Sequence, residues 1–121
     1  MGSGGAGGAG GGAIILNISN TLEINGSISV NGESNSTQGG GSGGTVYIKT
    51  DTFKGLPLSD ISANGGNGRT SGGSRAGGGG GGRIAVEYNT STFPADNLEC
   101  NGGIGRASGQ DGTIVINGTQ L

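Results

Sequence analysis

Five asparagines stand in the triplet that accepts N-linked glycans, and this is the chemistry that the residue pattern favours. The chain reads Asn-x-Ser/Thr at Asn17, Asn25, Asn35, Asn89 and Asn117. In a secreted protein this triplet marks a surface asparagine whose side-chain amide can be glycosylated. A single match is weak in a chain rich in Asn, Ser and Thr, so placement matters more. Alternation along the predicted strands points all of them outward except Asn35, which lies in a polar loop, and we predict glycosylation at these positions.

The remaining reactive residues form no recognisable catalytic or metal-binding pattern. The chain has no histidine and a single cysteine, which excludes Ser-His-Asp and Cys-His catalysis, His-based metal sites and CxxC pairs. The glycine runs lack the Lys-Ser/Thr ending of a phosphate-binding loop and the GxGxxG spacing of a dinucleotide site. A glycosidase needs two carboxylates across a cleft, and nothing singles out a pair among Asp51, Asp60, Glu87, Asp96 and Glu99. We predict no enzyme activity, no cofactor and no metal.

Two arginines and the cysteine occupy repeated positions. Arg69 and Arg106 lie in the same glycine-rich phrase, NGGNGRTSG (64–72) and NGGIGRASG (101–109). They either recognise a sugar or carboxylate or, as we prefer, donate hydrogen bonds to loop carbonyls of the next repeat. Cys100 aligns with Val30 and Ala63, which predicts a small buried apolar residue. An intermolecular disulfide is the alternative.

Composition narrows the class of protein further. The 121 residues make one domain (1–121) with a net charge of −2 and no basic patch, so we expect no nucleic-acid partner. No run approaches the roughly 18 apolar residues of a transmembrane helix, and the N-terminus shows no basic-then-apolar signal peptide. Glycine supplies 33 residues, whereas the aromatic residues are two Tyr and two Phe. The predicted core is therefore thin and aliphatic.

The elements that must position these residues are repeated. Segments start alike after glycine at GGAIILN (11–17), GGTVYIK (43–49), GGRIAVE (81–87) and DGTIVIN (111–117), and a second match recurs at ISVNG (28–32), ISANG (61–65) and LECNG (98–102). These define units 11–42, 43–80 and 81–111 and a partial unit, 112–121. Apolar and polar residues alternate, as in strands with one buried face. The shared offset predicts that 14–18, 46–48, 84–88 and 114–116 stack as parallel strands.

The glycine runs predict extended segments. In residues 2–12 the non-glycine residues recur every third position, the repeat of polyproline-II geometry, in which chains without side chains can pack closely. Six Asn-Gly pairs mark either hairpins, giving an antiparallel sandwich, or corners with left-handed dihedrals. Because equivalent strands recur once per unit, we predict an all-β fold: a parallel β-solenoid (β-helix) of about three repeats with glycine-rich, polyglycine-II-like segments.

Three strings, GGGSGGTVYI (39–48), ISANGGNG (61–68) and GGGGGGRIAVEY (77–88), resemble glycine-rich repeat segments of large secreted or surface proteins of microbes. The resemblance covers residues 11–121, and it implies a β-helix in an adhesin or an extracellular structure. It carries over no catalytic residue, and this chain is shorter than the long arrays usual in such proteins.

Together these patterns predict an extracellular or cell-surface structural protein, N-glycosylated and the protomer of a head-to-tail filament or surface layer. The fourth unit opens at 112–121 without a polar cap, so we expect copies of the chain to complete the stack; in an excerpt of a longer array these ends would be artificial. One alternative is a carbohydrate-binding or adhesive module using Tyr47, Arg69 and Arg106. A weaker one is an ice-binding protein, since TDT (50–52) and TST (90–92) do not occupy equivalent positions of the unit.

Overall fold

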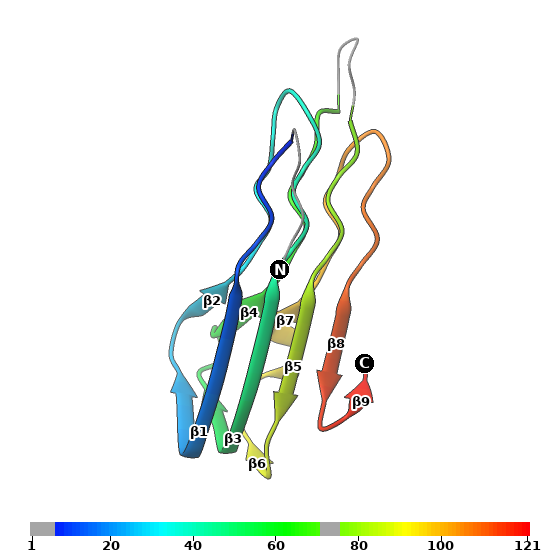
Figure 1. Cartoon of the computed structure of the whole chain (residues 1–121). Coiled ribbons are helices and arrows are strands. Elements are labelled where there is room, and N and C mark those ends of the chain that lie inside the picture. The colour runs from blue at the N-terminus through cyan, green and yellow to red at the C-terminus, as the bar shows by residue number, and fades with distance from the viewer. Residues whose placement is uncertain (1–6, 71–75) are drawn as a thin grey trace.

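The computed structural model describes residues 7–70 and 76–121, which form two sheets and a glycine-rich extension (Figure 1). The described elements, in chain order, are β1 (Ala13–Ile24), β2 (Ser27–Ser29), β3 (Thr45–Gly55), β4 (Asp60–Ser62), β5 (Arg83–Glu87), β6 (Thr90–Ser91), the 3-10 helix η1 (Ala95–Asn97), β7 (Leu98–Glu99), β8 (Thr113–Ile116) and β9 (Thr119–Gln120).

The large sheet contains the two longest strands, β1 and β3. Its strand order is β1-β3-β5-β8-β9, and β6 also pairs with β3. Strands β1, β3, β5 and β8 run parallel and side by side, whereas β9 folds back antiparallel to β8 (Figure 1). The register aligns Ile14, Val46, Ile84 and Ile114 in one row. The predicted stacking of these four parallel strands is confirmed.

The small sheet lies behind the large one, and the apolar core fills the space between them (Figure 1). It consists of β2, β4 and β7, all parallel. The most deeply buried apolar side chains are Val46, Ile48, Ile61, Ile84 and Val86 on the middle strands of both sheets, together with Ala63, which directly follows β4. Phe53 and Phe93 add a stacked aromatic pair with ring centroids 4.6 Å apart. Alternating strands therefore produce the thin, mainly aliphatic core that the composition required.

The predicted solenoid is wrong. The strands belong to two separate sheets, the larger sheet mixes parallel and antiparallel pairs, and the described residues form no closed coil. The glycine segments are the reason. After each strand of the small sheet the chain leaves the sheets, runs outward along a glycine-rich segment and returns to start the next long strand (Figure 1). A repeat of the same length fits either path, so the repeat alone does not establish closure.

The outward excursions pack against one another as a glycine bundle, which we define as residues 7–12, 30–44, 63–70, 76–82 and 100–112. Backbone hydrogen bonds of 2.8–2.9 Å cross it in series, with donors Glu33, Gly41, Gly66, Gly79 and Gly103 bonding in turn to the carbonyls of Ala9, Glu33, Gly41, Gly66 and Gly79. A Cβ at Gly66 or Gly79 would overlap a neighbouring backbone carbonyl. The described residues include one glycine with positive φ, Gly118, so glycine serves this bundle through close approach of backbones and not through left-handed dihedrals.

The Asn-Gly pairs have two structural roles. Asn117 and Gly118 have φ values of 49° and 82° and form the two-residue turn between β8 and β9, as expected for a hairpin of primed type. The hairpin alternative does not apply at Asn25-Gly26, because the flanking strands β1 and β2 belong to different sheets. The corner interpretation was right for this segment, but its left-handed dihedrals were not, since the remaining described Asn-Gly pairs lack positive φ.

Candidate functional site

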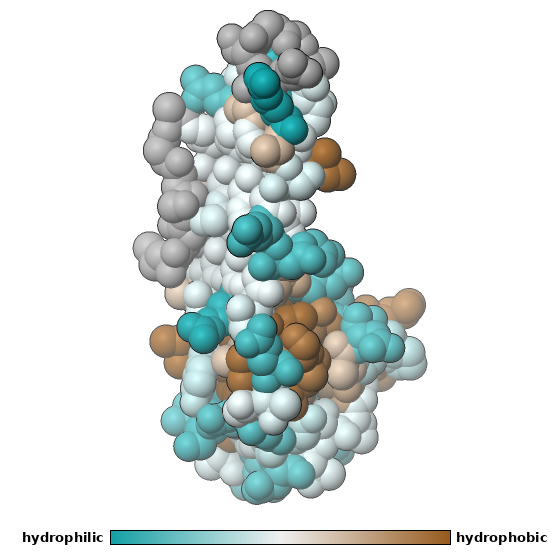
Figure 2. Space-filling model, turned by 90° about the vertical axis from the view of Figure 1, so that its right-hand side faces the viewer, coloured by the Kyte–Doolittle hydropathy of each residue, from teal (hydrophilic) through white to brown (hydrophobic). Residues whose placement is uncertain are grey.

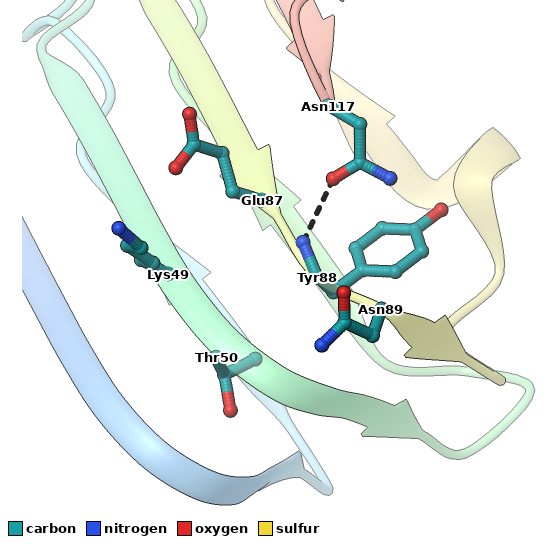
Figure 3. Close-up of a pocket in the computed structure, with 6 residues that line it drawn as sticks. All are labelled: Lys49, Thr50, Glu87, Tyr88, Asn89 and Asn117. Atoms are coloured by element: carbon teal, nitrogen blue, oxygen red, sulfur yellow. Dashed lines mark hydrogen bonds between the residues drawn. The ribbon is translucent and has the colours of Figure 1, made fainter.

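A hollow lies where β5 ends and the β8–β9 turn approaches it (Figure 3). It is shallow, and its lining residues are Lys49, Thr50, Glu87, Tyr88, Asn89 and Asn117. A second hollow shares Lys49, Thr50 and Asn89 and extends to Asn17 on β1. The register places Asn17, Lys49 and Glu87 in one row. We call Asn17, Lys49, Glu87, Asn89 and Asn117 the polar strip, which crosses the large sheet from β1 to the β8–β9 turn.

Hydrogen bonds fix several side chains of the polar strip. Asn117 accepts a hydrogen bond from the Tyr88 backbone amide at 2.8 Å (Figure 3), and Asn89 donates to the Asp51 carboxylate at 2.6 Å. The Tyr47 hydroxyl donates to Glu87 at 3.2 Å, and this bond to a carboxylate raises the pKa of Tyr47 above its usual value. The arrangement offers polar contacts to a ligand or a glycan, but it pairs no nucleophile with a base.

The structure brings three of the five predicted glycosylation sites together. Asn17, Asn89 and Asn117 line the polar strip, whereas Asn25 and Asn35 lie outside its hollows. All are exposed except Asn35, which is half-buried. The outward orientation expected from strand alternation is therefore present at the four exposed asparagines. Their convergence was not predicted, because Asn89 and Asn117 follow the ends of strands, where alternation no longer fixes position.

A glycan would be attached to the side-chain nitrogen of asparagine, and the five sites differ in the hydrogen bonds that this nitrogen makes. Among the described residues it makes no hydrogen bond at Asn17, Asn35 or Asn117, whereas Asn25 donates to Glu23 at 3.0 Å and Asn89 donates to Asp51. The Asn35 oxygen accepts three hydrogen bonds of 2.9 Å from Thr37 and Gln38. The local geometry therefore leaves Asn17 the most accessible acceptor, since it is exposed and unengaged.

The acids considered for glycosidase chemistry do not form a pair across one hollow. Glu87 lines the first hollow and Asp51 the second, and each already accepts a hydrogen bond from a neighbouring side chain. Asp60 lies in β4, Asp96 in η1 and Glu99 in β7. No cluster of metal-ligating side chains occurs in residues 7–70 and 76–121.

The candidate sugar-binding residues are also dispersed. Tyr47 lies in β3, and Arg69 and Arg106 lie in the glycine bundle. None of the three lines either hollow. The backbone amides of Arg69 and Arg106 donate to the carbonyls of Gln38 and Ala76. The hydrogen bonds expected from their guanidinium groups to loop carbonyls stay a prediction.

Cys100 is the small buried residue that its alignment predicted. Its side chain is 4% exposed and its Sγ lies 3.6 Å from the Thr113 carbonyl oxygen. Burial raises the pKa of the thiol to about 11, against a smaller opposing effect of a backbone hydrogen bond with Ile84. The thiol is therefore protonated at neutral pH and shielded from a second molecule, which argues against an intermolecular disulfide.

An asparagine ladder joins the small sheet to the glycine bundle. The backbone amide of Asn64 donates to the side-chain oxygen of Asn31 at 2.7 Å, and the backbone amide of Asn101 donates to the side-chain oxygen of Asn64 at 2.8 Å. Within the described residues the backbone amide of Asn31 and the side-chain oxygen of Asn101 have no hydrogen-bond partner. One end of the ladder thus presents a free donor and the other a free acceptor. The aligned Asn of ISVNG, ISANG and LECNG is the sequence signal for this ladder, although the sequence alone assigns these residues to corners.

The core is open at both ends of the strand stack. Ile84 and Val86 on the middle strand β5 are 0% and 1% exposed, whereas Ile14 on β1 and Ile114 and Ile116 on β8 are half-buried. Viewed from the side of β8 and β9, the lower half of the molecule shows apolar surface rimmed by hydrophilic residues, below a nearly neutral glycine-rich half (Figure 2). Apolar residues that belong to the core therefore reach the surface at both ends.

Comparison with known proteins identifies no relative: no family model, no curated protein and no solved structure matches this chain. The resemblance to repeat segments of surface proteins therefore stays a prediction. Among the described residues no helix has the length and apolar character needed to cross a membrane.

Proposed function

We propose that this chain is an extracellular structural protein that assembles end to end with copies of itself into a filament or surface layer. The observation that carries the proposal is the core left open at both ends, by Ile14 on β1 and by Ile114 and Ile116 on β8. Exposed apolar surface rimmed by polar residues is typical of protein–protein contacts. Different surfaces at the two ends favour a heterologous contact, which repeats and does not close.

The ends of the asparagine ladder support the same geometry. A donor at Asn31 and an acceptor at Asn101 complement each other when the last strand of one copy meets the first strand of the next. The β8–β9 hairpin covers the outer edge of β8, so the large sheet does not continue as a simple parallel ladder. The small sheet has no such cover on β7 within the described residues. The contact we propose therefore runs through the small sheet, the ladder and the apolar ends of the core.

The edge of β1 adds to the contact surface at the β1 end of the strand stack. β1 is twelve residues long and pairs only with β3 among the described strands. It contains no Lys and no Pro, the residues that commonly prevent edge strands from pairing with other chains. Ile15 on this strand is 72% exposed. An edge with these properties favours association with another molecule.

Assembly is tested by light scattering and electron microscopy of the isolated chain at micromolar concentration. We expect particles larger than the monomer that grow into filaments. Asn101→Lys places a charge at the open ladder end and should block growth, and it should leave the monomer folded because the Asn101 side chain is exposed and makes no hydrogen bond among the described residues. Leu58→Lys is the matched control, since Leu58 is 92% exposed in the loop between β3 and β4. A stable wild-type monomer without filaments on standing would contradict the proposal.

N-glycosylation at the exposed asparagines belongs to the same proposal. Peptides from the native source, analysed by mass spectrometry, should carry glycans at Asn17 above all, and at Asn25, Asn35, Asn89 and Asn117 to differing extents. Unmodified asparagine at all of these positions would remove the glycoprotein assignment. It would also weaken the extracellular location, but it would not affect the assembly test, which uses unglycosylated protein.

A further inference from the structure

We propose that two of the six Asn-Gly pairs, Asn25-Gly26 and Asn117-Gly118, convert spontaneously to aspartate and isoaspartate in the folded protein, while the other four are protected by the glycine bundle and the asparagine ladder. The six pairs have the same local sequence chemistry, so the folded structure alone decides between them. This inference does not depend on the proposed function.

The reaction needs only water. The backbone nitrogen of the glycine, after losing its proton, attacks Cγ of the preceding asparagine, forming a C–N bond and expelling the side-chain nitrogen as ammonia. The resulting five-membered succinimide is then hydrolysed at either carbonyl, which gives aspartate or isoaspartate. Glycine favours the attack because it has no Cβ to crowd the nitrogen. A glycine amide that is hydrogen-bonded and enclosed cannot reach Cγ without local opening.

Three of the protected pairs are held at both reacting groups. The amides of Gly32, Gly65 and Gly68 donate to the carbonyls of Asn64, Asn101 and Ile104 at 2.8 Å. The side-chain oxygens of the preceding residues, Asn31, Asn64 and Asn67, accept backbone hydrogen bonds of 2.7–2.8 Å. Attack would therefore break two hydrogen bonds at each pair and move the glycine nitrogen.

Crowding and a carboxylate protect the fourth pair, Asn101-Gly102. The Gly102 amide donates to the Asp111 carboxylate at 2.9 Å. A Cβ on Gly102 would overlap the carbonyl oxygen of Gly109, and equivalent overlaps surround Gly32, Gly65 and Gly68. All four protected glycines are thus fixed within the bundle and lack room for the rearrangement.

The glycines of the two labile pairs are open, although a hydrogen bond holds the Asn117 side-chain oxygen. Nothing lies within 4 Å of the position that a Cβ would take on Gly26 or Gly118, and neither amide donates a hydrogen bond within the described part of the chain. Asn25 and Asn117 are both exposed. Among the described residues the Asn25 side chain hydrogen-bonds only to Glu23, whereas the Asn117 side-chain oxygen accepts a hydrogen bond from the Tyr88 backbone amide and Asn117 lies in a left-handed turn. We therefore assign the faster conversion to Asn25.

Conversion has consequences for the edge of the large sheet and for glycosylation. Isoaspartate at position 117 adds a backbone carbon to the two-residue turn, so β9 no longer pairs in register with β8 and the edge of β8 opens. Both labile asparagines are also glycan acceptors by sequence. A glycan on the side-chain nitrogen would replace ammonia with a poorer leaving group, so glycosylation and conversion exclude each other at these positions.

The test is peptide mapping by mass spectrometry after incubation of the full-length, unglycosylated chain in mildly alkaline buffer, with and without denaturant. In the folded protein, Asn25 and then Asn117 should convert at least about tenfold faster than Asn31, Asn64 and Asn67. The reason is that two hydrogen bonds must first break at each of these three protected pairs. In denaturant all six pairs should convert at similar rates, which makes the unfolded chain the internal control.

A variant separates local chemistry from global unfolding. Gly26→Ala adds a methyl group into open space at negative φ, so the fold should be kept while conversion at Asn25 falls to the rate of the locked pairs and conversion at Asn117 is unchanged. Equal rates at Asn25 and Asn64 in the folded protein would overturn the inference, as would an Asn25 that resists conversion when folded but converts in denaturant.

Discussion

The glycine bundle and the two-sheet core hold neighbouring segments together by opposite means. In the sheets, side chains such as Ile48 and Ile84 fill the space between layers and exclude water. In the bundle, glycines occupy the positions where segments approach most closely, and order comes from peptide groups that donate and accept in series between segments. The core tolerates some change in side-chain volume. At its closest approaches, such as Gly66 and Gly79, the bundle tolerates none, because a Cβ there would occupy the position of a carbonyl.

The largest effect should come from one added methyl group in the bundle. A Cβ at Gly79 would overlap the carbonyl oxygen of Gly41, and the Gly79 peptide also bonds to Gly66 and Gly103. Gly79→Ala should therefore lower the free energy of unfolding by about 4 kcal/mol or more, which is a large part of the stability of a small domain. Chemical denaturation followed by circular dichroism measures it.

Gly12→Ala is the matched control for this change. Gly12 precedes β1, has nothing within 4 Å of the position that a Cβ would take and has no positive φ. The substitution should be neutral or stabilising by up to about 1 kcal/mol, since alanine reduces the entropy of the unfolded chain. Equal losses at positions 12 and 79 would mean that the close approach of backbones at Gly79 does not limit substitution there.

Removing atoms from the core should have the next largest effect. Ile84 is 0% exposed at the centre of the row that spans the large sheet. Ile84→Ala should cost about 2–5 kcal/mol through lost burial and the cavity that remains. Ile15→Ala, on the opposite face and 72% exposed, should change stability by less than about 0.5 kcal/mol. If deleting the Ile84 side chain cost more than adding a methyl at Gly79, the ranking of the two regions would be reversed.

The asparagine ladder connects the two regions, and its middle and end positions should behave differently. Asn64→Ala removes the acceptor for the Asn101 amide, so stability should fall by about 1–2 kcal/mol. Asn101→Ala removes a side-chain oxygen that has no partner in the described residues, so the monomer should be nearly unaffected. Both are read from denaturation curves below the concentration at which the chain assembles. A similar loss for both variants would show that the ladder hydrogen bonds do not stabilise the monomer.

The sequence predicted the register of the strands better than the path of the chain between them. The offset of Ile14, Val46, Ile84 and Ile114 from aligned glycines was sufficient to predict their parallel row, since repeats in a stack occupy equivalent positions. The solenoid failed because repeat length does not reveal whether a unit closes around a core or extends away from it. The Asn-Gly pairs misled for a related reason: their sequence is identical, but only Asn117-Gly118 uses the left-handed conformation among the described pairs. Contacts with distant backbone decide the others.

The candidate site was predictable in part. Strand alternation correctly turned Asn17 outward in the same row as Lys49 and Glu87. It also turned Asn89 and Asn117 outward, but it did not predict that they join the polar strip, which they do because the chain turns after β5 and β8. The ladder was visible as aligned Asn but not as hydrogen bonding, because the backbone amide that each side chain contacts belongs to the next repeat.

The smallest effect tests the junction of the two regions, where Cys100 is buried beside the start of β8 and its carbonyl accepts the Gly112 amide. The thiol pKa is about 11 in the folded protein and nearer 8.5 in the unfolded chain. The unfolded state therefore binds fewer protons than the folded state between these values, and the free energy of unfolding should fall as pH rises through this window. At about pH 10 the loss relative to pH 8 should be roughly 1–2 kcal/mol.

Cys100→Ala should lack this part of the loss, although Tyr47, whose pKa is also raised, still titrates in both proteins. Parallel curves of stability against pH for the wild type and Cys100→Ala, measured by rapid denaturation to limit Asn-Gly conversion, would show that the thiol is not buried as the structure places it.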